Sequence, residues 1–319
     1  ANNTYLDFVG GRTDLDIRVI RAIGDPSERF NEDKLRMLRA VCFAARLGFE
    51  IEATTMRAIQ QHAPEIQSTS AERIRDNLNY ILTEGSARRG FELLDESGLL
   101  EPILPEVVAM KGVEQPPEHH PEGDVWIHTL LMLEKLDDPS VTLALGTLLH
   151  DVGKPSTFHI ADRIRFNGHV EVGVRMAEAI CKRLRYSISE TKQVMDLVAN
   201  HMRFKDVKRM RQSTLKRFLR KPHFDEHMDL HRLDCLSSHG NLENYEFVRE
   251  KLAEAPTEVL HPPRLLTGDD LIAAGYQPGP QFAEIRRKVE DAQLEGRLMT
   301  KKEALEYVKE RWRNKGDQD

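Results

Sequence analysis

The sequence predicts an all-α protein of several domains, and three observations support that prediction. Beyond the first 30 residues, apolar residues recur every three or four positions in almost every segment, which is the period of a helix. At 319 residues the chain is longer than one domain usually is. Its 40% hydrophobic and 31% charged residues suffice for packed cores under a solvated surface. Only residues 1–30 have the texture of strands or loops.

The first two expected helices are marked at both ends. The stretch "EDKLRMLRAVCFAARLGF" follows Asn31, a candidate N-cap, and stops at Gly48. The stretch "SAERIRDNLNYILTEG" begins at Ser70 and stops at Gly85. Each helix has one apolar face, formed by Leu35, Leu38, Val41, Cys42 and Ala45 in the first and by Ile74, Leu78, Ile81 and Leu82 in the second.

A polar segment rich in Pro and His, residues 111–124, is the best candidate for a domain boundary. It follows the helical stretch "ARRGFELLDESGLLEPILPE" and precedes a second group of helices. The helices expected after it span about 126–137, 141–151, 168–185, 189–201, 213–220 and 224–238, and then about 280–294 and 301–314.

Composition and charge limit the classes of partner. No apolar run approaches the roughly 20 residues that a membrane helix needs, so no membrane partner is expected. Three cysteines without metal-type spacing fit a reducing cytoplasm. The net charge is −6, but residues 203–221 carry nine Lys or Arg against one Asp. That stretch either contacts a phosphate backbone or forms a solvated helical face beside the acidic residues that follow it.

One group of histidines and aspartates stands out because its members lie in apolar helical runs. His150 and Asp151 end such a run in "TLLHDVGKP". Burying imidazoles and carboxylates together is costly unless they are paired, and a metal ion resolves that cost. Any single histidine in such a run could instead be a hydrogen-bonded core residue. The six candidate ligands are His128, His150, Asp151, His169, His201 and Asp234.

The number of candidate ligands predicts two divalent ions. One ion would be held by His128, His150, Asp151 and Asp234, and the second by His169 and His201 with Asp151 as a bridge. These ligand types admit Mn, Fe, Co, Ni or Zn. Asp151 and Lys154 are the catalytic candidates, since Lys154 is expected at the mouth of the site, where it would contact a phosphate oxygen. Histidines in polar contexts, such as His119 and His120, are expected at the surface or behind the ligands.

The six residues over about 120–245 resemble the HD superfamily of metal-dependent phosphohydrolases. The matching pieces are His128, the "HD" pair at 150–151 and Asp234, while His169 and His201 match the extra ligands of two-metal members. The resemblance implies an all-helical domain that hydrolyses phosphoester bonds, commonly in nucleotides or at RNA ends.

The flanking segments resemble the CCA-adding enzyme and poly(A) polymerase family of bacterial nucleotidyltransferases. The long pattern "GDPSERFNEDKLRMLRAVCFAARLGF" carries this resemblance, together with "SAERIRDNL", "GLLEPILPE" and "LLTGDDLIAAGYQPGPQFAEI". In that family the Asp and Arg that match Asp33 and Arg36 select CTP and ATP for addition to the tRNA 3′ end. Asp33 and Arg36 are three residues apart in an expected helix, so they are expected to share one face. That spacing alone favours an ordinary ion pair, and the surrounding family pattern favours the nucleotide-selecting role. Candidate RNA contacts are Arg73, Lys208, Arg209, Arg211, Lys216 and Arg217.

Two departures from that family pattern matter. Cys42 stands where the pattern has Arg. The Gly-Ser and paired-Asp motifs, which bind Mg²⁺ and the nucleotide triphosphate in the family's catalytic head, do not occur in the sequence. We therefore expect that the chain alone does not add nucleotides and that the head is missing or is a separate piece. The resemblance implies four parts, namely the end of the head (1–30), a helical neck that binds nucleotide and RNA (31–110), an HD phosphohydrolase domain (111–255) and a helical tail (256–319).

These observations lead to one hypothesis and two alternatives. The chain is expected to be a headless portion of a tRNA nucleotidyltransferase with an HD site that acts on 2′,3′-cyclic phosphates or phosphomonoesters at RNA ends. One alternative is a non-catalytic module that binds RNA or nucleotide and has a structural HD cluster. The other is a nucleotidase unrelated to tRNA.

Overall fold

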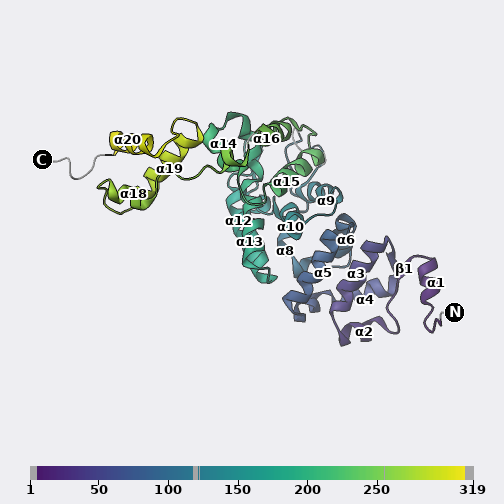
Figure 1. Cartoon of the computed structure of the whole chain (residues 1–319). Helices are drawn as coiled ribbons and strands as arrows, with labels where there is room; N and C mark the ends of the chain where they lie inside the picture. Colours follow the sequence, from purple (N-terminus) through teal and green to yellow (C-terminus); the bar gives the residue numbers. More distant parts are fainter. Residues whose placement is uncertain (1–5, 118–120, 122, 255, 313–319) are drawn as a thin grey trace, which may run out of the picture. The chain divides into compact units, whose positions relative to one another are not determined.

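The computed structural model describes residues 6–117, 121, 123–254 and 256–312, and it confirms the all-α prediction (Figure 1). The strands in this described part are four, each of two residues. β1 (Val19–Ile20) pairs in parallel with β2 (Glu50–Ile51), and β3 (His159–Ile160) pairs antiparallel with β4 (Ile164–Arg165). His119 and His120 lie outside the described residues.

The helices follow one another with short connections. Their bounds are α1 (Gly11–Asp16), α2 (Pro26–Glu32), α3 (Leu35–Leu47), α4 (Ala53–His62), η1 (Ala63–Ser68), α5 (Ala71–Thr83), α6 (Ala87–Glu96), α7 (Leu100–Ile103), α8 (Pro105–Val108), α9 (Val125–Glu134), α10 (Val141–Leu149), α11 (Lys154–Thr157), α12 (His169–Arg183), α13 (Ile188–Asn200), η2 (His201–Arg209), α14 (Gln212–Leu219), α15 (Phe224–Ser237), α16 (Glu243–Glu254), α17 (Thr257–Leu260), α18 (Gly268–Ala273), α19 (Gln281–Leu294) and α20 (Lys301–Arg311). None of the described helices is both long and apolar enough to cross a bilayer.

The chain forms two compact units. Unit 1 consists of residues 1–202 and 225–242, and unit 2 consists of residues 203–224 and 243–319. These boundaries differ from the four parts expected from the sequence, because compactness groups α15 with the helices before residue 202. The four-part division, which follows motifs, stays a prediction.

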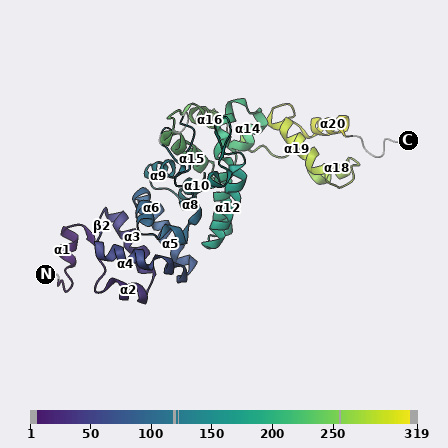
Figure 2. The same cartoon turned by 180° about the vertical axis from the view of Figure 1, so that it is seen from behind.

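The first half of unit 1 is built around α3. This helix packs against α5 and α6, and the three lie side by side in both views (Figure 1, Figure 2). Its apolar face buries Met37, Leu38 and Val41 completely. Gly48 ends the helix in the left-handed conformation at φ 64°, which confirms the predicted stop.

The predicted start of that helix is wrong. Asn31 lies inside α2, which begins after Asp25, whose carboxylate accepts the amide of Glu28. The chain then becomes extended at Asp33 (φ −153°), and the Asp33 carboxylate accepts the amide of Leu35. Asp33 therefore interrupts the single helix that apolar periodicity predicts here, because its side chain bonds to the backbone at the start of the next helix.

The first 30 residues are also more helical than expected, because they contain α1 and most of α2. The Asp7 carboxylate accepts hydrogen bonds from the backbone amides of Gly11 and Arg12, the first two residues of α1. Helices of six or seven residues are too short for a periodic pattern to reveal.

The second half of unit 1 confirms the helices predicted between 126 and 201 to within a few residues. α10 and α12 both pack on α13, and glycines let them approach closely. A Cβ on Gly146 of α10 would lie 2.7 Å from the Leu197 side chain of α13, and one on Gly173 of α12 would touch Val198. Met132, Leu143, Leu230 and Leu233 complete a small core with Leu197.

Unit 2 is organised on α19, which packs against α14 and α20. Its core contains Leu266, Leu271, Ile285, Val289 and Val308. The helices predicted at 280–294 and 301–314 are confirmed, the second to residue 311. The sequence analysis missed α16, which begins just after a turn at Gly240.

Gly90→Ala should destabilise unit 1 by about 1–3 kcal/mol through overpacking. The new Cβ would lie 2.3 Å from the Ile81 side chain, so α6 could no longer pack against α5 without a shift. Thermal and denaturant unfolding would measure this loss. Gly11→Ala is the matched control, since its Cβ meets nothing closer than 3.8 Å and the variant should unfold like the unaltered protein. Equal stability of both variants would contradict the proposed packing.

Candidate metal centre

The six candidate ligands come from five helices, and the structure brings all of them together. His128 lies in α9, His150 follows α10, His169 begins α12, His201 follows α13 and Asp234 lies in α15. Two groups form, in each of which the ligand atoms lie within 4.8 Å of one another. These groups are His128, His150 and Asp234, and Asp151, His169 and His201.

The Asp151 carboxylate connects the two groups. Its Oδ2 lies 3.1 Å from Nε2 of His150 in the first group. Its Oδ1 lies 3.8 Å from Nε2 of His169 and 3.7 Å from Nε2 of His201 in the second. In the first group, Nε2 of His128 lies 3.2 Å from Oδ1 of Asp234. Each group thus has access to one oxygen of the same buried carboxylate.

Three of the histidines are oriented by the same local device. Nδ1–H of His150, His169 and His201 donates to the backbone carbonyl three residues earlier, at 2.9, 2.8 and 2.7 Å. Because a carbonyl only accepts, the proton must be on Nδ1, and Nε2 carries the lone pair. This arrangement of a histidine with one nitrogen fixed by the backbone is typical of metal ligands.

The candidate ligands fit a metal ion because several of their buried nitrogen and oxygen atoms lack a hydrogen-bond partner in the described part of the chain. Within residues 6–117, 121, 123–254 and 256–312, Nε2 of His150, His169 and His201 is buried and has no hydrogen-bond partner, and the same holds for Oδ1 of Asp151. Buried polar atoms are rarely left so, and the exceptions need an explanation such as an ion. Three lone pairs and an anionic oxygen are the donor set that divalent transition metals take.

Electrostatics keeps these groups in the protonation states that metals require. Burial lowers the pKa of His201 to about 4 and lowers that of His169 as well, so both imidazoles are neutral at pH 7. Burial alone would raise the pKa of Asp151, but the Lys154 ammonium beside its carboxylate helps to hold that pKa well below its usual range. Ligand protons therefore do not compete with a metal at neutral pH.

Lys154 is buried, with 7% of its surface exposed, rather than placed at the mouth of the site as the sequence analysis expected. Its Nζ lies 2.6 Å from Oδ2 of Asp151, because residues three apart in a helical turn face each other. The same ammonium donates to Oε1 of Gln115 at 2.5 Å and lies 5.3 Å from the centre of the Phe166 ring. Sequence reasoning missed Gln115, which no periodic or spacing signal marks.

A glycine sets how closely these elements approach. A Cβ on Gly153 would lie 2.1 Å from the carbonyl oxygen of His169 and 2.6 Å from the amide of Gly173. The backbone two residues after Asp151 therefore touches the first turn of α12, which carries His169. Only a residue without a side chain permits this contact.

The two residues of the nucleotide-selecting pair predicted from the sequence lie on either side of the start of α3, joined by a backbone hydrogen bond from Arg36 to Asp33. Asp33 precedes α3 and accepts a hydrogen bond from Arg73 at 2.8 Å, whereas Arg36 lies within α3. The expectation that both share one helical face is therefore wrong, and its cause is the break at Asp33. The Arg36 guanidinium donates to Glu32 and to the backbone carbonyl of Arg29.

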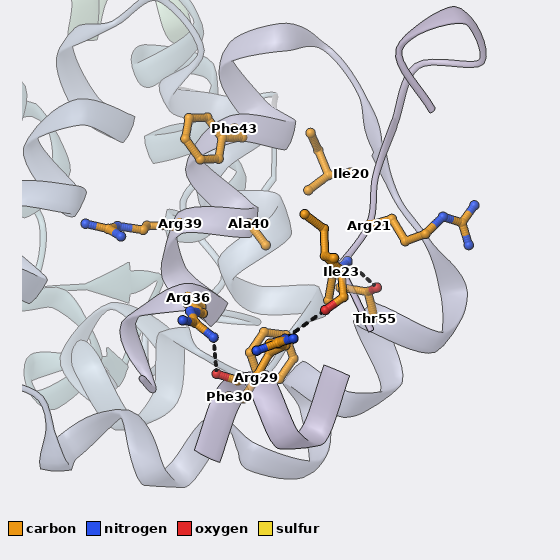
Figure 3. A pocket seen from close by; sticks show the side chains of 11 residues that line it. Ile20, Arg21, Ile23, Arg29, Phe30, Arg36, Arg39, Ala40, Phe43 and Thr55 are labelled. Carbon is orange, nitrogen blue, oxygen red and sulfur yellow. Dashed lines mark hydrogen bonds between the residues drawn. The ribbon is translucent and has the colours of Figure 1, made fainter. Parts of the chain in front are cut away.

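Arg36 lines a cavity of about 490 Å³ in unit 1. Figure 3 shows Arg29 and Arg36 joined by a hydrogen bond below the aromatic ring of Phe43. Arg21 and Arg39 also line the cavity, and Asp33 does not. Arg29 and Arg36 share Glu32, and the guanidinium groups of Arg21 and Arg39 point to opposite sides of the view, away from Phe43 (Figure 3).

The basic residues of 203–221 divide into two kinds. Lys216 donates to the carbonyl of Leu294, and Arg217 pairs with Glu290 and Asp291, so both hold α14 on α19. Lys208 is exposed and pairs with Glu243. Among the described residues, the exposed Arg209 and Arg211 form no ion pair within 4.0 Å.

Fold and site together define a helical protein with a buried His/Asp cluster of the HD type. The family model "HD domain" matches residues 123–237, and the model "Probable RNA and SrmB- binding site of polymerase A" matches residues 48–110. The A-adding tRNA nucleotidyltransferase of Deinococcus radiodurans is 32% identical over 96% of this chain and 74% of its own length. The chain belongs to the CCA-adding-type tRNA nucleotidyltransferase family.

Other similar proteins support this family assignment. The CC-adding tRNA nucleotidyltransferase of Thermus thermophilus is 32% identical over 88% of this chain and 67% of its own length. The CCA-adding enzyme of Bacillus stearothermophilus, solved in complex with CTP, shares the fold with a TM-score of 0.68 at 20% identity, covering 96% of this chain and 68% of that one. The Thermotoga maritima CCA-adding enzyme complexed with tRNA shares it with a TM-score of 0.52 at 19% identity, over 95% and 66%.

Gly153→Ala should weaken metal binding by about 10- to 100-fold, the range seen when a group that orients metal ligands is lost. The new methyl group would push the Asp151 turn away from His169. Titration of the metal-free protein with Mn²⁺ would measure the affinity. Gly279→Ala, whose Cβ meets nothing within 4 Å, is the control and should bind Mn²⁺ like the unaltered protein. Unchanged affinity in Gly153→Ala would contradict the inferred contact.

Proposed function

We propose that the chain hydrolyses phosphoester bonds at RNA 3′ ends through a two-metal HD site, as part of a tRNA nucleotidyltransferase. The observation that carries this proposal is the Asp151 carboxylate, which offers one oxygen to each of two groups of ligands. The six ligands are His128, His150, Asp151, His169, His201 and Asp234.

Divalent ions bound in such a site supply Lewis acidity and an activated water for attack on phosphorus. The residues of this chain do the rest. The backbone carbonyls three residues before His150, His169 and His201 fix their rings, and Asp151 spans both groups. The Lys154 ammonium, 2.6 Å from Asp151, offsets negative charge beside the carboxylate. The same ligands accept Mn, Fe, Co, Ni or Zn.

The substrate class follows from the family. The relatives are named for adding A, CC or CCA to tRNA, so the tRNA 3′ end is the partner that we propose. Hydrolysis of a terminal 2′,3′-cyclic phosphate leaves a phosphomonoester, and hydrolysis of that phosphomonoester would release phosphate and free the terminal hydroxyl for nucleotide addition. Because tRNA and free thiols are both typical of the cytoplasm, we place the protein there.

CTP and ATP are the nucleotides that we propose for the cavity lined by Arg36. Solved relatives are complexes with CTP and with ATP. Addition itself needs Mg²⁺ and a pair of carboxylates that the expected head supplies. Addition by these 319 residues alone is therefore not part of the proposal. Asp33 joins the nucleotide site only if its bond to Arg73 is exchanged for one to a base.

The RNA contacts that we propose are Arg209 and Arg211, with Lys208 beside them. All three are exposed, and the two arginines form no ion pair within the described part of the chain. Arg73, Lys216 and Arg217 were candidates as well, but each bonds to a carboxylate or carbonyl of the protein. An RNA phosphate would have to displace those partners.

A second candidate function is an RNA-binding module whose HD cluster is structural. The Lys154–Asp151 pair at 2.6 Å and the His128–Asp234 pair at 3.2 Å favour it, because they partly balance the buried charge without a metal. Metal content and turnover together separate the two functions. The hydrolase requires both, and the structural module requires neither.

Asp151→Asn should reduce hydrolysis of bis(p-nitrophenyl) phosphate by about 100-fold or more, because the shared anionic oxygen is lost. Chelation with EDTA should abolish turnover of the unaltered protein, and Mn²⁺ should restore it. Asp162→Asn is the matched control, since Asp162 is exposed and pairs only with Arg165 among the described residues. Retained turnover in Asp151→Asn with metal bound would reject the proposed site.

Replacing Arg209 and Arg211 together by Gln should weaken tRNA binding and lower the slope of log affinity against log salt by about one per arginine. The same replacement at Lys216 and Arg217 should leave that slope unchanged and instead lower the melting temperature, because α14 loses its ion pairs to α19. Filter binding over a salt series measures the slopes. Equal salt slopes for both double variants would count against the assignment.

A further inference from the structure

Gln115 lies at the edge of the metal centre although it belongs to none of the helices that supply ligands. The segment before it is fixed to the start of α9. Glu114 forms a β-bridge with Asp124, and the amide of Val125 donates to the carbonyl of Val113. α9 carries His128, so this pairing holds Gln115 beside the helix of one ligand. The Gln115 side chain is buried, with 3% of the residue exposed.

The orientation of the Gln115 amide follows from its neighbour. The Lys154 ammonium can only donate, so the group 2.5 Å from it must be the amide oxygen Oε1. The amide nitrogen Nε2 is bonded to the same carbon atom as Oε1. It therefore points away from the ammonium, although it belongs to the amide group that contacts the ammonium. Nε2 is buried and has no hydrogen-bond partner among the residues that the structure describes.

Two of the three N–H donors of Lys154 are engaged in contacts with oxygen atoms. One contacts Oδ2 of Asp151 at 2.6 Å, another contacts Oε1 of Gln115, and the ammonium faces the ring of Phe166. Within the described part of the chain, the amide of Gln115 is therefore an unused hydrogen-bond donor next to the Lys154–Asp151 pair, in addition to the third N–H of Lys154. Buried donors without a partner are unfavourable, and a ligand that accepts from them removes that penalty.

We propose that Gln115 completes the phosphoryl-binding part of the HD site. Its Oε1 holds Lys154 against Asp151, and its Nε2–H₂ donates to a non-bridging oxygen of the substrate phosphate. This inference rests on the proposed hydrolase function and assigns to it a substrate-binding residue. A neutral amide suits the task, because it supplies donors without adding a carboxylate or imidazole that competes for the metal.

The experiment uses the full chain loaded with Mn²⁺ and inorganic phosphate as the probe. Gln115→Met keeps the length of the side chain and removes both polar atoms. Calorimetry should show phosphate binding weakened about tenfold with Mn²⁺ stoichiometry unchanged, because the donor to phosphate is lost. The melting temperature should fall, because the buried Lys154 ammonium loses its acceptor Oε1. Gln115→Glu, which retains an acceptor for Lys154 but adds a negative charge, should weaken phosphate binding further.

Gln193→Met is the matched control. Gln193 is also a buried glutamine of unit 1, but its amide donates to Glu226 at 2.9 Å. This variant should also melt at a lower temperature but, unlike Gln115→Met, should bind phosphate normally. Phosphate affinity unchanged in Gln115→Met, or lost together with Mn²⁺, would overturn the inference.

The two proposals fail in different ways. If the unaltered protein binds phosphate but hydrolyses no phosphoester, the hydrolase function fails, and a tenfold loss in Gln115→Met still supports the phosphate contact. If the Mn²⁺-loaded, unaltered protein binds no phosphate, the contact assigned to Gln115 is overturned as well.

Discussion

The site depends on one buried carboxylate. Asp151 is 2% exposed, and water cannot stabilise its charge, so the surrounding groups must. Lys154 and His150 do so on one oxygen, and the other oxygen faces His169 and His201. Removing any of these neighbours leaves an anion in a low-dielectric interior. The helices that supply ligands are therefore constrained to meet at this residue.

That constraint connects backbone packing with chemistry. Gly153 lets the turn after Asp151 touch α12, which sets the distance to His169. Lys154 reaches back to Asp151 and at the same time binds Gln115 in the segment before α9. Ligand geometry, the position of the lysine and the proposed phosphate contact are thus coupled through a few residues, and a change in one should be felt in the others.

Sequence reasoning located most helices and the six residues of the His/Asp cluster because apolar periodicity and polar residues in apolar runs are local signals. It failed where the outcome depends on contacts between distant segments. The break at Asp33 depends on a cap and on Arg73, 40 residues later in the chain. The partners of Lys216 and Arg217 lie in α19. Gln115 is defined only by its contact with Lys154 across 39 residues.

The most direct test of the account is the electron paramagnetic resonance spectrum of the protein titrated with Mn²⁺. A shared carboxylate should hold two ions roughly 3.5–4 Å apart, close enough for their spins to couple. The account predicts two Mn²⁺ per chain and a spin-coupled spectrum. A single uncoupled six-line signal at saturation, or no Mn²⁺ binding at all, would contradict it.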